Sequence, residues 1–117
     1  MGTGDAQVFS RTAAFNFNVA GFFTKWLRDV AADQSPDGKV PFVVPDILRE
    51  GGSTGWGDAA VVVPWTMSLC YGDKRLLAEQ YPSMLKWVEF GRSQLNADGI
   101  WAGGFHFGDW LAVPPPD

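Results

Sequence analysis

The chain has 117 residues, of which 46% are hydrophobic and 15% aromatic, so it can build one small domain and is too apolar to be intrinsically disordered. Its net charge of −4 does not provide the basic surface that nucleic-acid binding requires, so no nucleic-acid partner is expected. The longest apolar run, residues 59–65, is far too short to cross a bilayer, and no membrane partner is expected either.

The chain contains one cysteine and one histidine. Cys70 cannot form an internal disulfide, and because it lies in an apolar run we expect a small buried side chain rather than a reactive thiol. His106 alone provides neither a metal site nor a catalytic triad. No metal site is therefore expected.

The first helix is predicted to begin near Asp5. Val8, Phe9, Thr12 and Ala13 follow it at the spacing of one helical face. We therefore expect these four side chains to lie on the side of the helix that faces the core.

The second helix has the clearest amphipathic pattern in the chain. Asn16 or Asn18 offers an N-cap, and the helix should end near Ala32 or Asp33, before Pro36. Its apolar residues recur at i, i+3, i+4, i+7, i+8 and i+11, which predicts one buried face. That face consists of Val19, Phe22, Phe23, Trp26, Leu27 and Val30.

Residues 34–57 are predicted to form a long loop, because eight prolines and glycines leave no room for a helix of ordinary length. Residues 40–44 could make a short extended piece. A connection of this length in a compact protein is commonly functional or disordered. Its apolar interior favours a packed, functional loop; the residues concerned are Phe42, Val43, Val44, Ile47 and Leu48.

The third helix should run from Asp58, as N-cap or first-turn acid, to about Tyr71, with Gly72 as its stop. It is apolar nearly all round, which predicts burial on all sides. Pro64 should kink it. Because Trp65 lies at a helical position in this run, as Trp26 and Trp87 do in other helices, we expect all three to be core residues.

Two further helices are predicted before the chain becomes a loop. Asp73 can cap a short helix over 74–80, and Pro82 suits the first position of a separate last helix. The last helix should end at 96–99, and a Gly- and aromatic-rich loop follows from Ile100. Its apolar residues are Met84, Leu85, Val88 and Leu95.

The order of these elements predicts an all-α fold with two concentric layers, as in part of an α/α barrel with long functional loops. A helix that is apolar all round belongs to an inner layer, and the one-sided helices beside it belong to an outer layer. Both long loops follow a one-sided helix. We therefore expect them to emerge at the same rim of the barrel.

Three of the loop segments combine aspartate with glycine, and two of them add tryptophan. They are Gly4-Asp5, Gly55-Trp56-Gly57-Asp58 and Gly108-Asp109-Trp110. A carboxylate accepts hydrogen bonds from sugar hydroxyls, and an indole covers the apolar C–H face of a pyranose ring. This composition favours a carbohydrate site.

Six segments resemble, in order, the catalytic domain of bacterial α-L-rhamnosidases, and together they run through nearly the whole chain. The segments are residues 4–9 (GDAQVF), 23–29 (FTKWLRD), 43–46 (VVPD), 55–60 (GWGDAA), 63–65 (VPW) and 105–111 (FHFGDWL). The resemblance implies an (α/α)6 barrel that releases terminal L-rhamnose from glycosides or polysaccharides by inversion, without a cofactor. Residues 1–117 would form part of that barrel, whose remainder would be their partner.

The resemblance also says which residues take part. Family members place the general acid Glu just before the Gly-Asp-Ala-Gln motif and the general base Glu in a much later segment. Both would lie outside residues 1–117, so the chain has no catalytic residue and should be inactive alone. Where the family has Trp two residues before the motif, this chain has Gly2.

The family's sugar-binding residues fall on positions of this chain. Asp5 resembles the acid that hydrogen-bonds rhamnose hydroxyls, and Trp56 and Trp110 resemble the walls of the pocket. Asp58 and Asp109 belong to the same motifs, with substrate contact and helix capping both open. For the remaining candidate, His106, lining the pocket and a structural hydrogen bond are equally open.

Two alternatives remain at this stage. One keeps the barrel and changes the sugar, as in other six-hairpin glycosidases. The other is a complete helical carbohydrate-binding or interaction module without catalysis. The sequence indicates no compartment, no aglycone and no oligomeric state.

Overall fold

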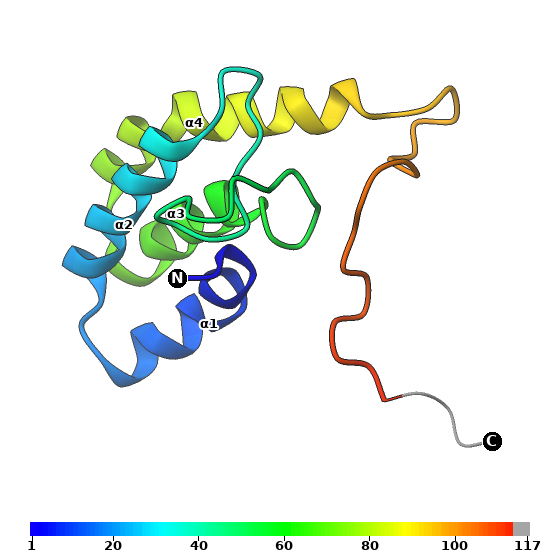
Figure 1. Cartoon of the computed structure of the whole chain (residues 1–117). Helices are drawn as coiled ribbons and strands as arrows, with labels where there is room; N and C mark the ends of the chain where they lie inside the picture. Colours follow the sequence, from blue (N-terminus) through cyan, green and yellow to red (C-terminus); the bar gives the residue numbers. More distant parts are fainter. Residues whose placement is uncertain (114–117) are drawn as a thin grey trace.

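The structure is a computed structural model that describes residues 1–113. Within them the chain forms four α-helices and no strand, which confirms the predicted all-α class (Figure 1). No helix among these residues is both long and apolar enough to span a membrane. The helices are α1 (Thr3–Asn16), α2 (Ala20–Asp33), α3 (Ala59–Tyr71) and α4 (Lys74–Ser93).

Helix α3 is the centre of the arrangement, because it packs against α1, α2 and α4. Its Ala59, Val63 and Met67 are almost fully buried, together with Leu27 of α2. A helix that carries apolar side chains on several faces can bury them only among several neighbours. The position of α3 thus agrees with its predicted place in an inner layer.

Helix α1 does not present the predicted face to the core. Ala6, Ser10 and Ala13 are buried, whereas Val8 and Phe9 are 76% and 52% exposed. Small side chains let α1 approach α3 closely. The larger apolar residues lie on faces for which residues 1–113 supply no cover, and a pattern of hydrophobic spacing cannot tell these two faces apart.

Helix α2 follows its predicted face except at one position. Phe23, Trp26, Leu27 and Val30 are buried, but Phe22 is 56% exposed. Val19 occupies the N-cap position without a side-chain cap, so neither predicted asparagine is the N-cap residue. Asn18 lies next to it and its Oδ1 accepts only a long 3.4 Å hydrogen bond from the Ala20 N–H.

The sequence predicts that α3 is buried on all sides, but the structure exposes part of it. Trp65 is 54% exposed, Leu69 is 62% exposed, and Cys70 is also exposed. The predictions of a core Trp65 and a buried Cys70 are therefore wrong for residues 1–113. Leu69 and Cys70 line a pocket together with Arg11 and Phe15 of α1, which covers them only in part.

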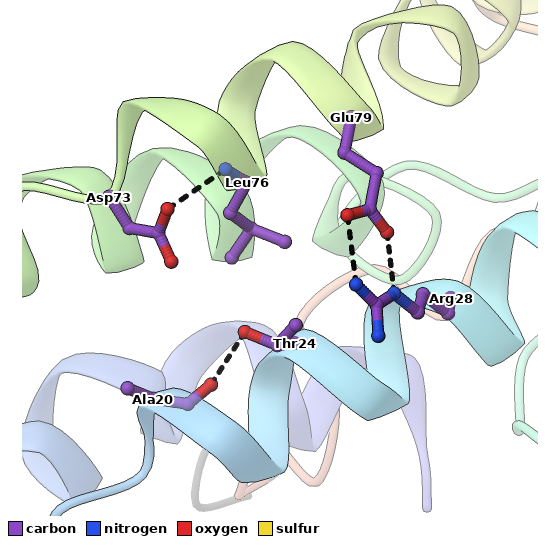
Figure 2. Close-up of polar contacts among 6 residues, drawn as sticks. All are labelled: Ala20, Thr24, Arg28, Asp73, Leu76 and Glu79. Atoms are coloured by element: carbon purple, nitrogen blue, oxygen red, sulfur yellow. Dashed lines mark hydrogen bonds and ion pairs between the residues drawn. The ribbon is translucent and has the colours of Figure 1, made fainter.

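Helix α4 is one helix of 20 residues rather than two, and Pro82 lies inside it. Proline removes one backbone donor, but the packing of Gln80, Ser83 and Trp87 holds the helix on both sides of it. Trp87 is buried, as predicted. The predicted Asp73 cap is confirmed, because its carboxylate accepts a 2.9 Å hydrogen bond from the Leu76 N–H (Figure 2).

The outer faces of α2 and α4 are joined by one ion pair across the surface. The guanidinium of Arg28 donates to both carboxylate oxygens of Glu79, at 2.6 and 3.0 Å (Figure 2). This contact raises the pKa of Arg28 and lowers the pKa of Glu79. Within α2, the Thr24 hydroxyl donates to the Ala20 carbonyl, a local bond that satisfies a polar side chain.

The two long irregular segments meet at one end of the helices. We call residues 34–58 the first rim loop and residues 94–113 the second rim segment. The first rim loop begins where α2 ends and leads into α3, and the second leaves the end of α4 (Figure 1). The Thr3 N–H donates to the Phe42 carbonyl, so the start of α1 joins the same rim. The predicted common rim is thus observed.

Candidate carbohydrate-binding site

A row of aromatic rings joins the two rim elements. The Trp56 ring of the first rim loop lies 4.2 Å, centroid to centroid, from the Phe107 ring of the second rim segment. Trp110 lies 5.9 Å from Trp56 at an interplanar angle of 88° and 4.9 Å from Phe107. The two tryptophans predicted to form the site are therefore neighbours, and their indole planes are nearly perpendicular. We call this pair, Trp56 and Trp110, the corner.

Trp56 is held in place by a glycine of α1. A Cβ built on Gly4 would lie 2.7 Å from the Trp56 ring, which no side chain at that position could tolerate. The indole therefore lies directly on the backbone of the first turn of α1. This contact explains the glycine of the Gly-Asp-Ala-Gln motif by close packing and brings Asp5 to the same rim.

Asp58 supports the Trp56 turn through both of its carboxylate oxygens. Its Oδ2 accepts a 2.8 Å hydrogen bond from the Gly55 N–H, and its Oδ1 accepts one of 2.9 Å from the Trp87 indole of α4. Asp58 occupies the N-cap position of α3 but makes no side-chain cap. A Cβ on Gly57 would overlap the Trp87 ring, so the turn packs tightly against α4.

Asp5 lies in the first turn of α1, and its side chain is exposed. Its carboxylate makes no hydrogen bond or ion pair with any residue in 1–113, although it lies close to Gly2. An unbonded carboxylate at a helix N-terminus is stabilised by the helix dipole and keeps its acceptor oxygens available. It can therefore accept hydrogen bonds from a ligand.

His106 uses both ring nitrogens within the chain. Its Nε2 lies 3.0 Å from the Gly103 carbonyl oxygen, and because a carbonyl can only accept, Nε2 carries the proton. Its Nδ1 lies 3.2 Å from the Thr54 hydroxyl. His106 thus ties the second rim segment to the first rim loop, and its ring packs 5.1 Å from Trp101.

The remaining predicted residues lie at the surface of the second rim segment. Trp110 is 56% exposed, and Asp109 is exposed with no side-chain hydrogen bond to residues 1–113. No group of three or more histidine, cysteine or acidic side chains in the described part of the chain is arranged to hold a metal ion.

The sequence did not identify three residues that take part in the site. They are Phe107, Gly4, on whose backbone Trp56 packs, and Trp87, which donates a hydrogen bond to Asp58. Phe107 stands inside the 105–111 motif, so its motif membership was an available signal. Trp87 is 29 residues from Asp58 in sequence and reaches it only through the packing of α4 beside α3.

Comparisons with known proteins agree on one family. The model of the bacterial alpha-L-rhamnosidase 6 hairpin glycosidase domain matches residues 2–117. An α-L-rhamnosidase of Streptomyces avermitilis is 41% identical over 95% of this chain, and one of Formosa agariphila is 40% identical over 97%. The chain spans 11% and 12% of the length of these two relatives.

Two solved structures resemble the fold of the chain. The crystal structure of the Streptomyces avermitilis α-L-rhamnosidase complexed with L-rhamnose has a TM-score of 0.89 and 39% identity, covering 96% of this chain and 11% of that one. An α-L-rhamnosidase structure from Dictyoglomus thermophilum has a TM-score of 0.74 and 33% identity, covering 80% and 11%. On the family match, the sequence identities and the shared fold, the chain belongs to the six-hairpin glycosidase domain family of bacterial α-L-rhamnosidases.

Proposed function

We propose that the chain acts as part of a glycoside hydrolase that removes terminal α-L-rhamnose by inverting hydrolysis, and that it supplies walls of the rhamnose site. Family membership supports the reaction class, and the names of the relatives support the sugar. The chain's share of those relatives makes it one segment of such an enzyme.

The observation that carries this proposal is the corner formed by Trp56 and Trp110. Trp110 is 56% exposed and stands at 88° to the half-buried Trp56, so the Trp110 ring can cover the apolar face of a pyranose, with Trp56 as the second wall. Asp5, whose carboxylate is exposed and unbonded, lies one residue from the glycine on which Trp56 rests. We assign to Asp5, and to Asp109 beside Trp110, the hydrogen bonds from rhamnose hydroxyls.

Asp58 and His106 have a different part in this proposal. The hydrogen-bonding atoms of both side chains already have partners inside the chain. We assign Asp58 to holding the Trp56 turn and His106 to joining the two rim elements. Both would act on the sugar through the residues that they position.

Inverting hydrolysis requires one carboxylic acid to protonate the leaving oxygen and a second carboxylate to activate water on the opposite ring face. We propose that both come from segments outside this chain, as the family resemblance implies. Asp5, Trp56 and Trp110 would then hold and orient the rhamnose ring without transferring a proton. Purified chain should accordingly show no measurable turnover of an aryl α-L-rhamnoside.

The rest of the barrel is the partner that this function needs. Val8, Phe15 and Phe22 are 76%, 79% and 56% exposed, and an apolar groove lies between α1 and α2. Exposed apolar surface of this extent is typical of an interface rather than of a free face. We propose that neighbouring helical hairpins of the same barrel cover it. No observation favours a complete stand-alone module.

Two matched tryptophan variants test the assignment of the wall. Trp110 and Trp65 are 56% and 54% exposed, but only Trp110 lies at the rim. Trp110→Leu should weaken L-rhamnose binding about fivefold, the scale of one lost aromatic contact of about 1 kcal/mol, while Trp65→Leu leaves it unchanged. Equal dissociation constants for the two variants in an NMR titration would contradict the assignment of Trp110 as a wall of the rhamnose site.

The identity of the sugar is tested in the same titration. Replacing L-rhamnose by D-glucose or D-mannose should leave the Trp56 and Trp110 indole signals in place. If glucose moved them as strongly as rhamnose does, the barrel would remain and the sugar assignment would be wrong.

A further inference from the structure

The C-terminal half of α4 carries two aromatic residues, Trp87 and Phe90, on which the first rim loop rests. A Cβ built on Gly57 would overlap the Trp87 ring. A Cβ on Gly52 would lie 3.2 Å from the Phe90 ring, and one on Gly38 would lie 3.3 Å from the Phe90 Cβ. The loop therefore meets α4 with its backbone at three separate points. Packing this close leaves the loop little freedom to shift along the helix.

The second rim segment reaches the same two rings through Trp101. The Trp101 ring lies 6.0 Å, centroid to centroid, from Trp87 and 5.7 Å from Phe90. A Cβ on Gly91 would lie 3.5 Å from the Trp101 ring, so the indole also packs on the backbone of α4. Trp101 thus attaches the start of the segment that carries Trp110 to this helix.

Trp87 also makes a polar contact with the first rim loop. Its Nε1–H donates to Asp58 Oδ1 at 2.9 Å, and the other oxygen of the same carboxylate accepts from the Gly55 N–H at 2.8 Å. Gly55 and Asp58 stand on either side of Trp56 in the sequence. The carboxylate therefore connects the turn that carries Trp56 to an indole of α4. Hydrogen bonds accepted by a carboxylate are stronger than those between neutral groups.

We infer that Trp87 is a positioning residue of the proposed sugar site, and that it holds both walls from α4. Its N–H sets the Trp56 turn through Asp58, and its ring seats Trp101 at the base of the segment that carries Trp110. The inference rests on the proposed function for the use of the two walls. Trp87 is 4% exposed, so it acts through these neighbours and does not touch the sugar.

A second buried tryptophan shows that the fold does not itself require such a contact. Trp26 of α2 is 5% exposed, and its Nε1 is buried without a hydrogen-bond partner in residues 1–113. The core therefore accommodates an indole whose N–H has no acceptor, although such a donor costs free energy. Trp87 differs because its acceptor belongs to the rim. The two tryptophans consequently form a matched pair for a test.

The test compares Trp87→Phe with Trp26→Phe in the full chain, by following the indole N–H signals in two-dimensional NMR spectra. Both variants keep a buried aromatic ring and remove an indole N–H, and unfolding measurements report the stability that each loses. Without sugar, the Trp56 and Trp101 signals should move in Trp87→Phe and stay in place in Trp26→Phe. Trp87→Phe should weaken L-rhamnose binding roughly fivefold, the scale of one hydrogen bond, while Trp26→Phe leaves it unchanged.

Asp58→Asn tests the same contact from the rim, without changing a core ring. Its amide NH2 group must face one of the two donors, the Gly55 N–H or the Trp87 N–H, so one hydrogen bond is lost. In combination with Trp87→Phe, the amide oxygen can accept from Gly55 and the second donor is gone. The double variant should therefore bind rhamnose no more weakly than Trp87→Phe alone. Losses that add would overturn a role of Trp87 through Asp58.

The outcomes separate this inference from the proposed function. If the unchanged chain responds to rhamnose and Trp87→Phe alters neither its affinity nor the Trp56 signal, Trp87 is a core residue only and the proposed function stands. Equal affinity losses in Trp87→Phe and Trp26→Phe would trace the effect to stability and overturn the inference as well.

If rhamnose moves no signal of the unchanged chain, the proposed function fails. The spectra without sugar then still decide the inference about Trp87. Trp56 and Trp101 signals that move in Trp87→Phe alone support its hold on both rim elements, and signals that stay in place overturn it.

Discussion

The two rim elements contribute to the site in different ways. The first rim loop is part of the core, because Val40 and Val44 are almost fully buried and its backbone is hydrogen-bonded to α1 and to itself. The second rim segment is attached mainly through its rings and His106, and its Leu111 and Val113 are 80% and 89% exposed. Trp56, in the first rim loop, is thus held by the packed core, whereas Trp110, in the second rim segment, is held by side-chain contacts at the surface.

This difference assigns separate tasks to the two tryptophans. Trp56 rests on Gly4 and its turn is tied to Asp58, so its position follows from the stability of the fold. Trp110 depends on Phe107 and on the contact with Trp56 itself. Changes in the first rim loop should therefore reduce stability, whereas changes in the second rim segment should reduce sugar affinity at nearly constant stability.

The largest effect on stability is expected from Gly57→Ala, which disturbs the packing of the first rim loop. The added methyl overlaps the Trp87 ring, and neither the buried ring nor the Asp58 contact leaves room for it. Overpacking of this kind should cost about 3 kcal/mol of unfolding free energy, measured by thermal or denaturant unfolding. Gly103→Ala in the second rim segment meets no atom within 4 Å and should change stability little. Similar losses of unfolding free energy in both variants would contradict the difference in stability between the first rim loop and the second rim segment.

A smaller effect on stability is expected from Phe107→Leu, which loosens the second element. Phe107 contacts the rings of Phe42, Phe105, Trp56 and Trp110, but the segment carrying it adds few buried residues. We expect a stability loss below about 1 kcal/mol and a several-fold weaker affinity for rhamnose. Unfolding and sugar titration of the same sample measure both. A loss of several kcal/mol would show that the segment belongs to the core.

The smallest effect concerns the Arg28–Glu79 pair, which lies away from the rim. The hydrogen bond from Arg28 lowers the pKa of Glu79, so this carboxylate stabilises the fold above its unfolded pKa of about 4.3. That contribution should be lost as the pH falls through the lowered folded-state pKa. Glu79→Gln should slightly flatten the dependence of the melting temperature on acid pH and leave sugar binding intact. An unchanged pH profile would mean that the pair contributes nothing.

Much of the fold follows from local sequence patterns. The periodicity of residues 19–30 places α2, Asp73 marks the start of α4, and the breakers between 34 and 57 define the first rim loop. The inward face of α1 could not be predicted, because its large apolar residues are largely exposed in residues 1–113 while small ones are buried against α3. The prediction that a new helix starts at Pro82 was wrong, because the tertiary packing of α4 stabilises one long helix despite the hydrogen bond that proline removes.

The candidate site divides in the same manner. Glycine-flanked aspartates and tryptophans indicated which residues meet at the rim, and Trp56 and Trp110 are neighbours in the structure. Which carboxylates already have partners inside the chain depends on contacts between distant segments. Asp58 and Asp5 look alike in sequence, but only Asp58 reaches Trp87. The contacts between the first rim loop and α4 likewise join segments far apart in the sequence.

The most direct test of the account is a two-dimensional amide NMR spectrum of the chain that follows its six indole N–H signals during addition of L-rhamnose and then D-glucose. The account predicts that the Trp56 and Trp110 signals move with rhamnose alone, while those of the buried Trp26 and Trp87 stay in place. Rim indole signals that are indifferent to rhamnose, or that respond equally to glucose, would contradict a rhamnose-binding wall in this chain.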